Sequence, residues 1–260
     1  SRDINKRIAI IGAGPAGLSA AEALKEKGYK NITLLEKSER AGGKCCSIEY
    51  QGRSYELGAG IISENNVTVR ALVKKFQIPV LPVRFEQSLQ LDSNTGTELP
   101  KASMKETLAL LYQVFVTYRR LIRKYDAVTK PGYAHVPSEL SVPFTPWAKE
   151  QGVSLVAKEF AGFFTGWGYG YFDEVPAAYS LKYNSWEVLK AFISRKIYKF
   201  PGGIQHLWTA VAQAHDVRYG VTIRSVVRAD QVTISTDAGD LIFDEVLIAS
   251  PLDDALSYLD

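Results

Sequence analysis

The stretch that decides the fold is IAIIGAGPAGL, residues 8–18. Its apolar residues end at Ile11, a Gly-Ala-Gly-Pro-Ala-Gly turn follows at residues 12–17, and a helical pattern continues to Lys27. A buried strand that turns on glycines into a helix brings backbone N–H groups and the positive helix end onto a diphosphate. The stretch therefore predicts a dinucleotide site with these contacts: Gly12, Gly14, Pro15, Ala16 and Gly17.

An acidic residue stands at the spacing that such a site requires. A second predicted strand, residues 31–35, ends at Glu36, which lies 19 positions after Gly17. The acid that binds the ribose hydroxyl of a dinucleotide is expected about 20 positions on. We therefore expect Glu36 to contact the ribose. The alternative is an ordinary strand-helix unit with a surface glutamate.

Two further glycine elements indicate which dinucleotide is bound. Residues 42–44 read Gly-Gly-Lys, and residues 58–61 read Gly-Ala-Gly-Ile. Together with the first turn, they resemble the flavin-containing amine oxidase superfamily, in which these segments hold FAD. The resemblance implies FAD, not NAD, and adds these contacts: Lys37, Gly43, Lys44, Gly58, Ala59, Gly60 and Ile61. Lys44 replaces the usual arginine of the family, which keeps the charge but loses the bidentate fork. The alternative for the Gly-Gly pair is a flexible loop.

The composition limits the class of protein. The 260 residues are 46% hydrophobic, enough for a sizeable core, and the net charge of +3 is too balanced to indicate a nucleic-acid partner. Cys45 and Cys46 are adjacent and predict neither a disulfide framework nor a metal site, so we expect a reduced, cytoplasmic setting. No signal peptide is recognisable, and the apolar residues 108–116 are too few to span a membrane.

The pattern divides the chain into three parts. Residues 1–82 give the first part of a FAD-binding domain, residues 83–199 a largely helical insertion, and residues 200–260 the second part. The predicted fold class is thus α/β, a Rossmann-like FAD-binding domain with an inserted substrate domain. In the family that the chain resembles, such an insertion covers the flavin, a strand residue matching Ile223 reaches the adenine, and the fold continues beyond this chain's last residue. The chain is therefore expected to be a short relative or a fragment. For Ile223 the alternative is an ordinary strand residue.

Within the insertion, two local patterns predict structure. Ser103 and Glu106 form a capping box that opens a long helix with an apolar stripe up to Tyr125. Residues 80–91 alternate as a strand does, and residues 92–96 predict a hairpin turn after it.

The most distinctive stretch is aromatic. Residues 163–183 hold eight aromatic side chains with three interleaved glycines, which suits a flat apolar lining for an extended hydrocarbon. The stretch resembles FAD-dependent polyunsaturated fatty acid double-bond isomerases. This resemblance implies that Phe192 gates the substrate entrance, that Phe164 and Trp167 lie along the same tunnel, and that Arg84 meets the fatty-acid carboxylate. The alternatives are core packing for the two phenylalanines and a solvated strand position for Arg84.

The implied reaction is an isomerisation. In it, flavin N5 takes a hydride from an allylic methylene and returns it at another carbon, so no catalytic side chain is required. The implied partner is a free fatty acid, and no nucleic-acid partner is expected. The basic side chains among residues 119–124 suit at most peripheral membrane contact, and the preferred alternative is an ordinary charged face at the end of a helix. A FAD-dependent oxidase or desaturase of an apolar substrate, and an inactive FAD- or lipid-binding relative, remain as alternatives. No metal is expected, because the three histidines lack ligand partners at metal-binding spacing: His135, His206 and His215.

Overall fold

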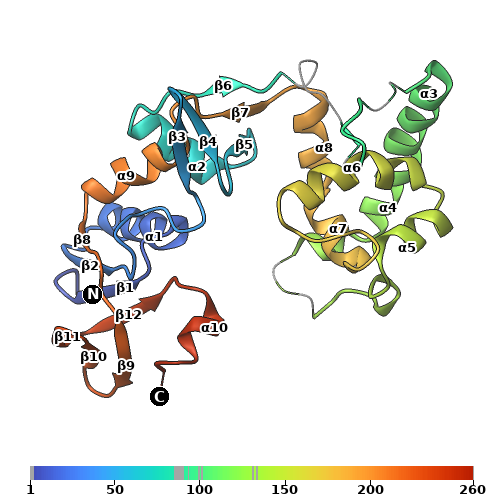
Figure 1. The fold of residues 1–260 in the computed structure, drawn as a ribbon. Coiled ribbons are helices and arrows are strands. Elements are labelled where there is room, and N and C mark those ends of the chain that lie inside the picture. Colours follow the sequence, from blue (N-terminus) through green and yellow to red (C-terminus); the bar gives the residue numbers. More distant parts are fainter. Residues whose placement is uncertain are drawn as a thin grey trace. The chain divides into compact units, whose positions relative to one another are not determined.

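The computed structural model describes residues 3–84, 91–92, 94–98, 100, 102–130, 132 and 134–259. The chain forms two compact units (Figure 1). Ser1–Leu81 and Tyr198–Asp260 make up the first unit, and Pro82–Ile197 makes up the second. Among the described helices, none combines the length and the apolar character that crossing a membrane requires.

A parallel sheet of four strands forms the centre of the first unit. Its order is β12-β1-β2-β8, with these bounds: β1 (Arg7–Ile11), β2 (Asn31–Leu35), β8 (Asp216–Arg218) and β12 (Glu245–Ile248). Strand β1 is central, pairing Ile10 with Leu34 of β2 and with Leu247 of β12. Its residues from Ile8 onward are all buried, as expected of a parallel strand covered on both faces.

Different elements pack on the two faces of the sheet. Ile8 and Ile10 pack with α1 (Pro15–Glu26), α2 (Val67–Lys75) and α9 (Gln205–Gln213). Ala9 and Ile11 point the other way, since side chains alternate along a strand. They pack on an antiparallel sheet whose order is β11-β10-β9, with these bounds: β9 (Ile223–Arg228), β10 (Val232–Thr236) and β11 (Gly239–Phe243).

Short elements complete the first unit. A hairpin pairs β3 with β4, and another small sheet has the order β5-β7-β6. The bounds are β3 (Ser47–Tyr50), β4 (Arg53–Glu56), β5 (Ile61–Ser63), β6 (Leu81–Pro82), β7 (Ile197–Lys199) and, near the C-terminus, α10 (Leu252–Ala255).

The second unit is helical. Its elements are α3 (Met104–Tyr112), a π-helical segment (Gln113–Tyr118), α4 (Arg119–Lys124), 3-10 turns at Asp126–Thr129 and Ser138–Leu140, α5 (Phe144–Glu150), α6 (Ser154–Gly166), α7 (Ala177–Tyr183) and α8 (Trp186–Ile193). Tyr118, Leu140, Phe144 and Leu181 lie in its core with almost no exposed surface.

The predicted fold class is confirmed, and so are several local predictions. The capping box is present: Ser103 Oγ accepts a hydrogen bond from the Glu106 N–H at 3.2 Å, and Glu106 Oε2 accepts one from the Ser103 N–H at 2.8 Å. The helix after it is not one continuous α-helix, because the π-helical segment interrupts it. The predicted turn near residue 92 closes with a hydrogen bond from the Gly96 N–H to the Asp92 carbonyl, at 2.8 Å.

The predicted strand over residues 80–91 is wrong in its described part. Only Leu81 and Pro82 form a strand there. Pro82 has no N–H to donate to a neighbouring strand. One further hydrogen bond, from the Val83 N–H to the Ile197 carbonyl at 2.9 Å, follows it, but Val83 and Arg84 are not part of the strand. Residues 85–90 lie outside the described part of the chain.

Candidate cofactor and substrate site

The glycine turn between β1 and α1 disfavours a side chain at two positions, by backbone conformation and a tight contact at Gly12 and by lack of space at Gly17. Gly12 has a φ of +103°, and a Cβ there would lie 3.2 Å from the backbone of Ala249. A Cβ at Gly17 would lie 1.9 Å from the Gly12 carbonyl oxygen, an impossible contact. Helix α1 begins at Pro15 without a side-chain cap. Its first N–H groups and its positive end are therefore available to an anion.

Glu36 ties this turn to the end of β2. Its side chain is buried, with 8% exposed surface. Oε2 accepts a hydrogen bond from the Ala13 N–H at 2.8 Å, and Oε1 accepts from the N–H and the hydroxyl of Ser38 at 2.9 and 2.8 Å. Burial, together with the charge of Glu36, raises the pKa of Tyr219. Glu36, the residue predicted to bind the ribose, thus lies directly beside the glycine turn.

The Gly-Gly element packs on the same turn. The Gly42 N–H donates to the Ala13 carbonyl at 2.9 Å, and a Cβ at Gly43 would lie 3.1 Å from the Gly14 Cα. The Arg40 guanidinium donates to the Gly43 carbonyl at 2.9 Å and, at 3.4 Å each, to the carbonyls of Ala41 and Cys45. Sequence reasoning missed Arg40. The signal that could have found it is a basic residue placed just before a glycine loop whose carbonyls need donors.

The third glycine element packs on the second. A Cβ at Gly58 would lie 1.9 Å from the Lys44 carbonyl oxygen, and the Leu57 N–H donates to the Cys46 carbonyl at 2.8 Å. At Gly60, a Cβ would overlap the side chain of Glu56. The structure thus brings together all three glycine elements, and it leaves the side chains of Lys44, Ala59 and Ile61 exposed.

A polar network fixes the hairpin that carries the third element. Glu56 Oε1 accepts from the Ile204 N–H at 2.9 Å, and Oε2 accepts from the Ser47 hydroxyl at 2.6 Å. The backbone N–H of Gln205 donates to Ser47 Oγ at 3.2 Å, and the side-chain amide of Gln205 donates to the Ala41 carbonyl at 3.4 Å. The hairpin, the start of α9 and the Gly-Gly loop are therefore held as one group, which the sequence did not reveal.

Two predicted cofactor residues lie at the edge of this group. Lys37 is exposed and pairs with Asp254 of α10, with Nζ and Oδ2 3.1 Å apart. Ile223 begins β9 and is half-buried. The chain just before it reaches Glu36, because the Val221 N–H donates to the Glu36 carbonyl at 2.9 Å.

The predicted substrate residues separate into two environments in the second unit. Phe164 has 1% exposed surface and stacks in the core, with its ring centroid 4.7 Å from that of Phe172. Trp167 is 38% exposed, and its ring centroid lies 5.9 Å from that of Phe192. The Phe163 ring contacts both, with its centroid 6.2 Å from that of Trp167 and 5.5 Å from that of Phe192. Phe163 and Phe164 are consecutive in helix α6, and the 100° step between them gives the two rings different surroundings.

Arg84 is exposed at the end of a described range. Its role toward a carboxylate stays a prediction.

The comparison with protein families matches residues 15–257 to the family described as flavin containing amine oxidoreductase. The chain belongs to this family. FAD is the cofactor that this membership indicates.

Three relatives show the range of similarity of this family member. It superimposes on the CLA-producing fatty acid isomerase from P. acnes with a TM-score of 0.82 and 29% identity, covering 100% of this chain and 62% of that one. A structure of putrescine oxidase gives a TM-score of 0.70 at 18% identity, covering 98% and 60%. The FAD-dependent oxidoreductase oblC of Cochliobolus heterostrophus is 24% identical over 270 residues, which are 96% of this chain and 55% of the relative. This family member thus spans less than two thirds of the length of each.

The residues present fit FAD. The turn at Gly12 and Gly17 admits backbone approach where any side chain would clash, the α1 N-terminus is uncapped, and a buried carboxylate, Glu36, stands beside it. Diphosphate and ribose recognition need these three features.

Three further titratable groups, Glu22, His215 and Cys45, lie in the first unit outside the proposed cofactor contacts. Within the described ranges, no group of three or more His, Cys, Asp or Glu side chains could hold a metal ion. His215 Nε2 instead lies 2.7 Å from Oε1 of the buried Glu22, whose other oxygen contacts Lys75. Burial raises the pKa of the Cys45 thiol, which disfavours its reactive thiolate form.

Proposed function

We propose that this protein isomerises double bonds in a polyunsaturated fatty acid with the help of bound FAD. One observation favours an isomerase over an oxidase. The likeness to the CLA-producing isomerase from P. acnes extends over the whole chain at 29% identity, whereas the likeness to putrescine oxidase, at 18%, is a likeness of fold.

In this proposal the first unit holds the cofactor. The α1 N-terminus and the glycine turn bind the diphosphate, and Glu36 accepts from the ribose. The further contacts are those expected from the sequence: Lys37, Gly43, Lys44, Gly58, Ala59, Gly60, Ile61 and Ile223. When bound, FAD supplies reversible two-electron chemistry. Arg40 and Glu56 are positioning residues. Arg40 donates to the Gly43 carbonyl of the second glycine element, and Glu56, two positions before the third, accepts from the Ile204 N–H.

The second unit supplies substrate contacts. Trp167 and Phe192 present partly exposed rings that suit an unsaturated alkyl chain and exclude water from it. Phe164 lies in the core and contacts this aromatic surface through Tyr169, whose ring centroid is 5.4 Å from that of Phe164 and 6.4 Å from that of Trp167. Arg84 meets the carboxylate through its guanidinium fork. No side chain is assigned a proton transfer, because bound FAD would supply the two-electron chemistry of the reaction.

The reaction type is tested by following hydrogen. The FAD-loaded protein is given linoleate deuterated at the bis-allylic carbon, and the product is analysed by mass spectrometry while oxygen is monitored. We expect a conjugated diene that carries substantial deuterium on a new carbon, with no oxygen consumed. Stoichiometric oxygen uptake, or a product two hydrogens poorer, contradicts the isomerase.

A second candidate is a FAD-dependent oxidase or desaturase of an apolar substrate. It is favoured by the match to the FAD-dependent oxidoreductase of Cochliobolus heterostrophus, which covers 96% of this chain. The same experiment separates the two, because an oxidase loses the label to the medium and reduces an acceptor.

A further inference from the structure

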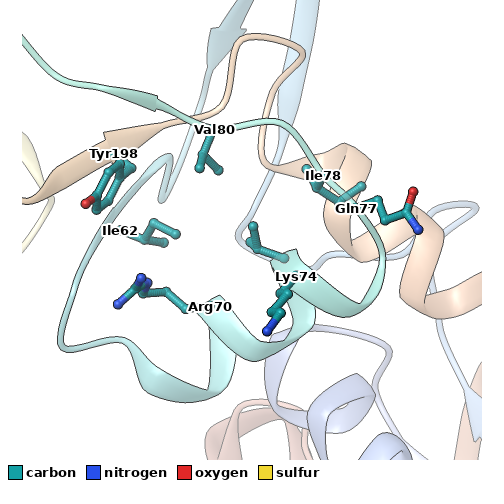
Figure 2. A pocket seen from close by; sticks show the side chains of 8 residues that line it. Ile62, Arg70, Lys74, Gln77, Ile78, Val80 and Tyr198 are labelled. Atoms are coloured by element: carbon teal, nitrogen blue, oxygen red, sulfur yellow. The ribbon is translucent and has the colours of Figure 1, made fainter.

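A half-open cavity of about 340 Å³ lies in the first unit, against α2 and Tyr198 of β7 (Figure 2). Its lining residues are Ile62, Arg70, Val73, Lys74, Gln77, Ile78, Val80 and Tyr198. None of them belongs to the cofactor or substrate residues assigned above. The volume is at the lower end of the ~300–1,000 Å³ typical of small-molecule sites.

The walls of this cavity are apolar and firmly supported. Ile62 is itself part of the core of the first unit, and Val73, Ile78, Val80 and Tyr198 pack against that core. The cavity is therefore preformed, and an alkyl chain that fills it displaces water from apolar surface without reordering the protein.

Two cations stand at this apolar surface. Arg70 and Lys74 lie one turn apart on α2, and Figure 2 shows the Arg70 guanidinium below Ile62 while the Lys74 ammonium points outward. The Arg70 guanidinium donates a hydrogen bond of 3.4 Å to the Glu64 carbonyl, at the limit of useful length. In the part of the chain that the structure describes, neither cation is paired with a carboxylate. An anion that enters the cavity therefore meets the guanidinium of Arg70 at its apolar wall.

We propose that this cavity binds the anion of a medium-chain fatty acid, with the carboxylate on Arg70 and the alkyl chain against Ile62, Val80 and Tyr198. A phosphate would satisfy the cation but would leave the apolar walls in water. An uncharged alkyl compound would fill the walls but would leave the cation unpaired. The site is separate from the aromatic surface at Trp167, and it does not rest on the proposed isomerisation.

The test is a calorimetric titration of the purified protein with decanoate below its micelle-forming concentration. We expect saturable binding with one decanoate per cavity, much weaker binding of 1-decanol, and none of inorganic phosphate. Arg70→Gln should weaken decanoate binding about tenfold, the scale of a lost charge-assisted hydrogen bond, and Arg70→Lys should restore part of it. Arg120→Gln, an exposed arginine on α4, is the matched control and should leave the affinity unchanged.

A second measurement locates the ligand. A decanoate that carries a photoreactive diazirine on its chain should label peptides that contain Val80 or Tyr198. Labelling of α6 or α8 would report the proposed substrate surface and is scored separately. The proposal is overturned if peptides that contain Val80 or Tyr198 are not labelled, if decanol binds as tightly as decanoate, or if Arg120→Gln weakens binding as much as Arg70→Gln. None of these readouts involves turnover, so failure of the isomerase proposal would leave them unaffected.

Discussion

Glu36 Oε2 accepts a hydrogen bond from the backbone N–H of Ala13 across 2.8 Å, which joins the end of β2 to the glycine turn after β1. The same carboxylate accepts from the N–H of Ser38 at 2.9 Å. It therefore has two functions in the proposed site, to hold the turn and to receive the ribose.

Glu36→Ala should weaken FAD binding by about 1–3 kcal/mol, because a charge-assisted hydrogen bond to the ribose is lost and the turn is released. Titration of the apo-protein with FAD measures this. Glu39→Ala, on an exposed neighbour, is the control and should have little effect. Unchanged affinity in Glu36→Ala would remove Glu36 from the site.

Gly17→Ala should destabilise the protein by about 3 kcal/mol or more, because the added methyl group would meet the Gly12 carbonyl oxygen at 1.9 Å. Gly162→Ala is a matched control in α6, where a Cβ would meet no atom within 4 Å. There, alanine should stabilise by up to about 1 kcal/mol. Urea unfolding of both variants checks the contrast, and equal effects would contradict it.

The pH dependence of stability should carry the signature of Glu22. Its burial raises the pKa, but hydrogen bonds from Lys75 and His215 outweigh this and hold the pKa below the ordinary 4.5. Because the folded-state pKa is the lower one, the stabilisation is complete above pH 4.5 and is lost as the pH falls through the folded-state value. Urea unfolding between pH 7 and pH 3 should show a smaller decline for Glu22→Gln. An identical decline would assign the acid sensitivity to other groups.

Phe164→Ala should cost about 3–5 kcal/mol of unfolding free energy, since the ring is fully buried among aromatic neighbours. The adjacent Phe163→Ala should cost less, because that ring is only partly buried. Thermal or urea unfolding decides this. A smaller loss for Phe164 than for Phe163 would contradict the assigned core position.

Arg84→Ala should weaken binding of linoleate about tenfold and leave binding of its methyl ester nearly unchanged, because the ester carries no charge for the guanidinium to pair with. Competition binding with acid and ester measures both affinities. Equal losses would give Arg84 a structural role.

The chain alone determined the features that depend on neighbours in sequence. Strand β1, the glycine turn, α1 and β2 are consecutive, so the turn and Glu36 could be placed together from spacing. Ser103 and Glu106 form their capping box for the same reason, since both partners lie within one helical turn.

Tertiary structure decided what depends on contacts far apart in sequence or on helical phase. Glu56 receives the N–H of Ile204 only because the chain returns to the first unit after the helical one, and β12 completes the sheet beside β1 in the same way. Adjacent aromatic residues look alike in the sequence, yet the 100° step of a helix sends Phe164 into the core and leaves Phe163 only partly buried. Burial on one side of a helix is fixed by the elements that pack there, and local sequence does not specify which elements those are.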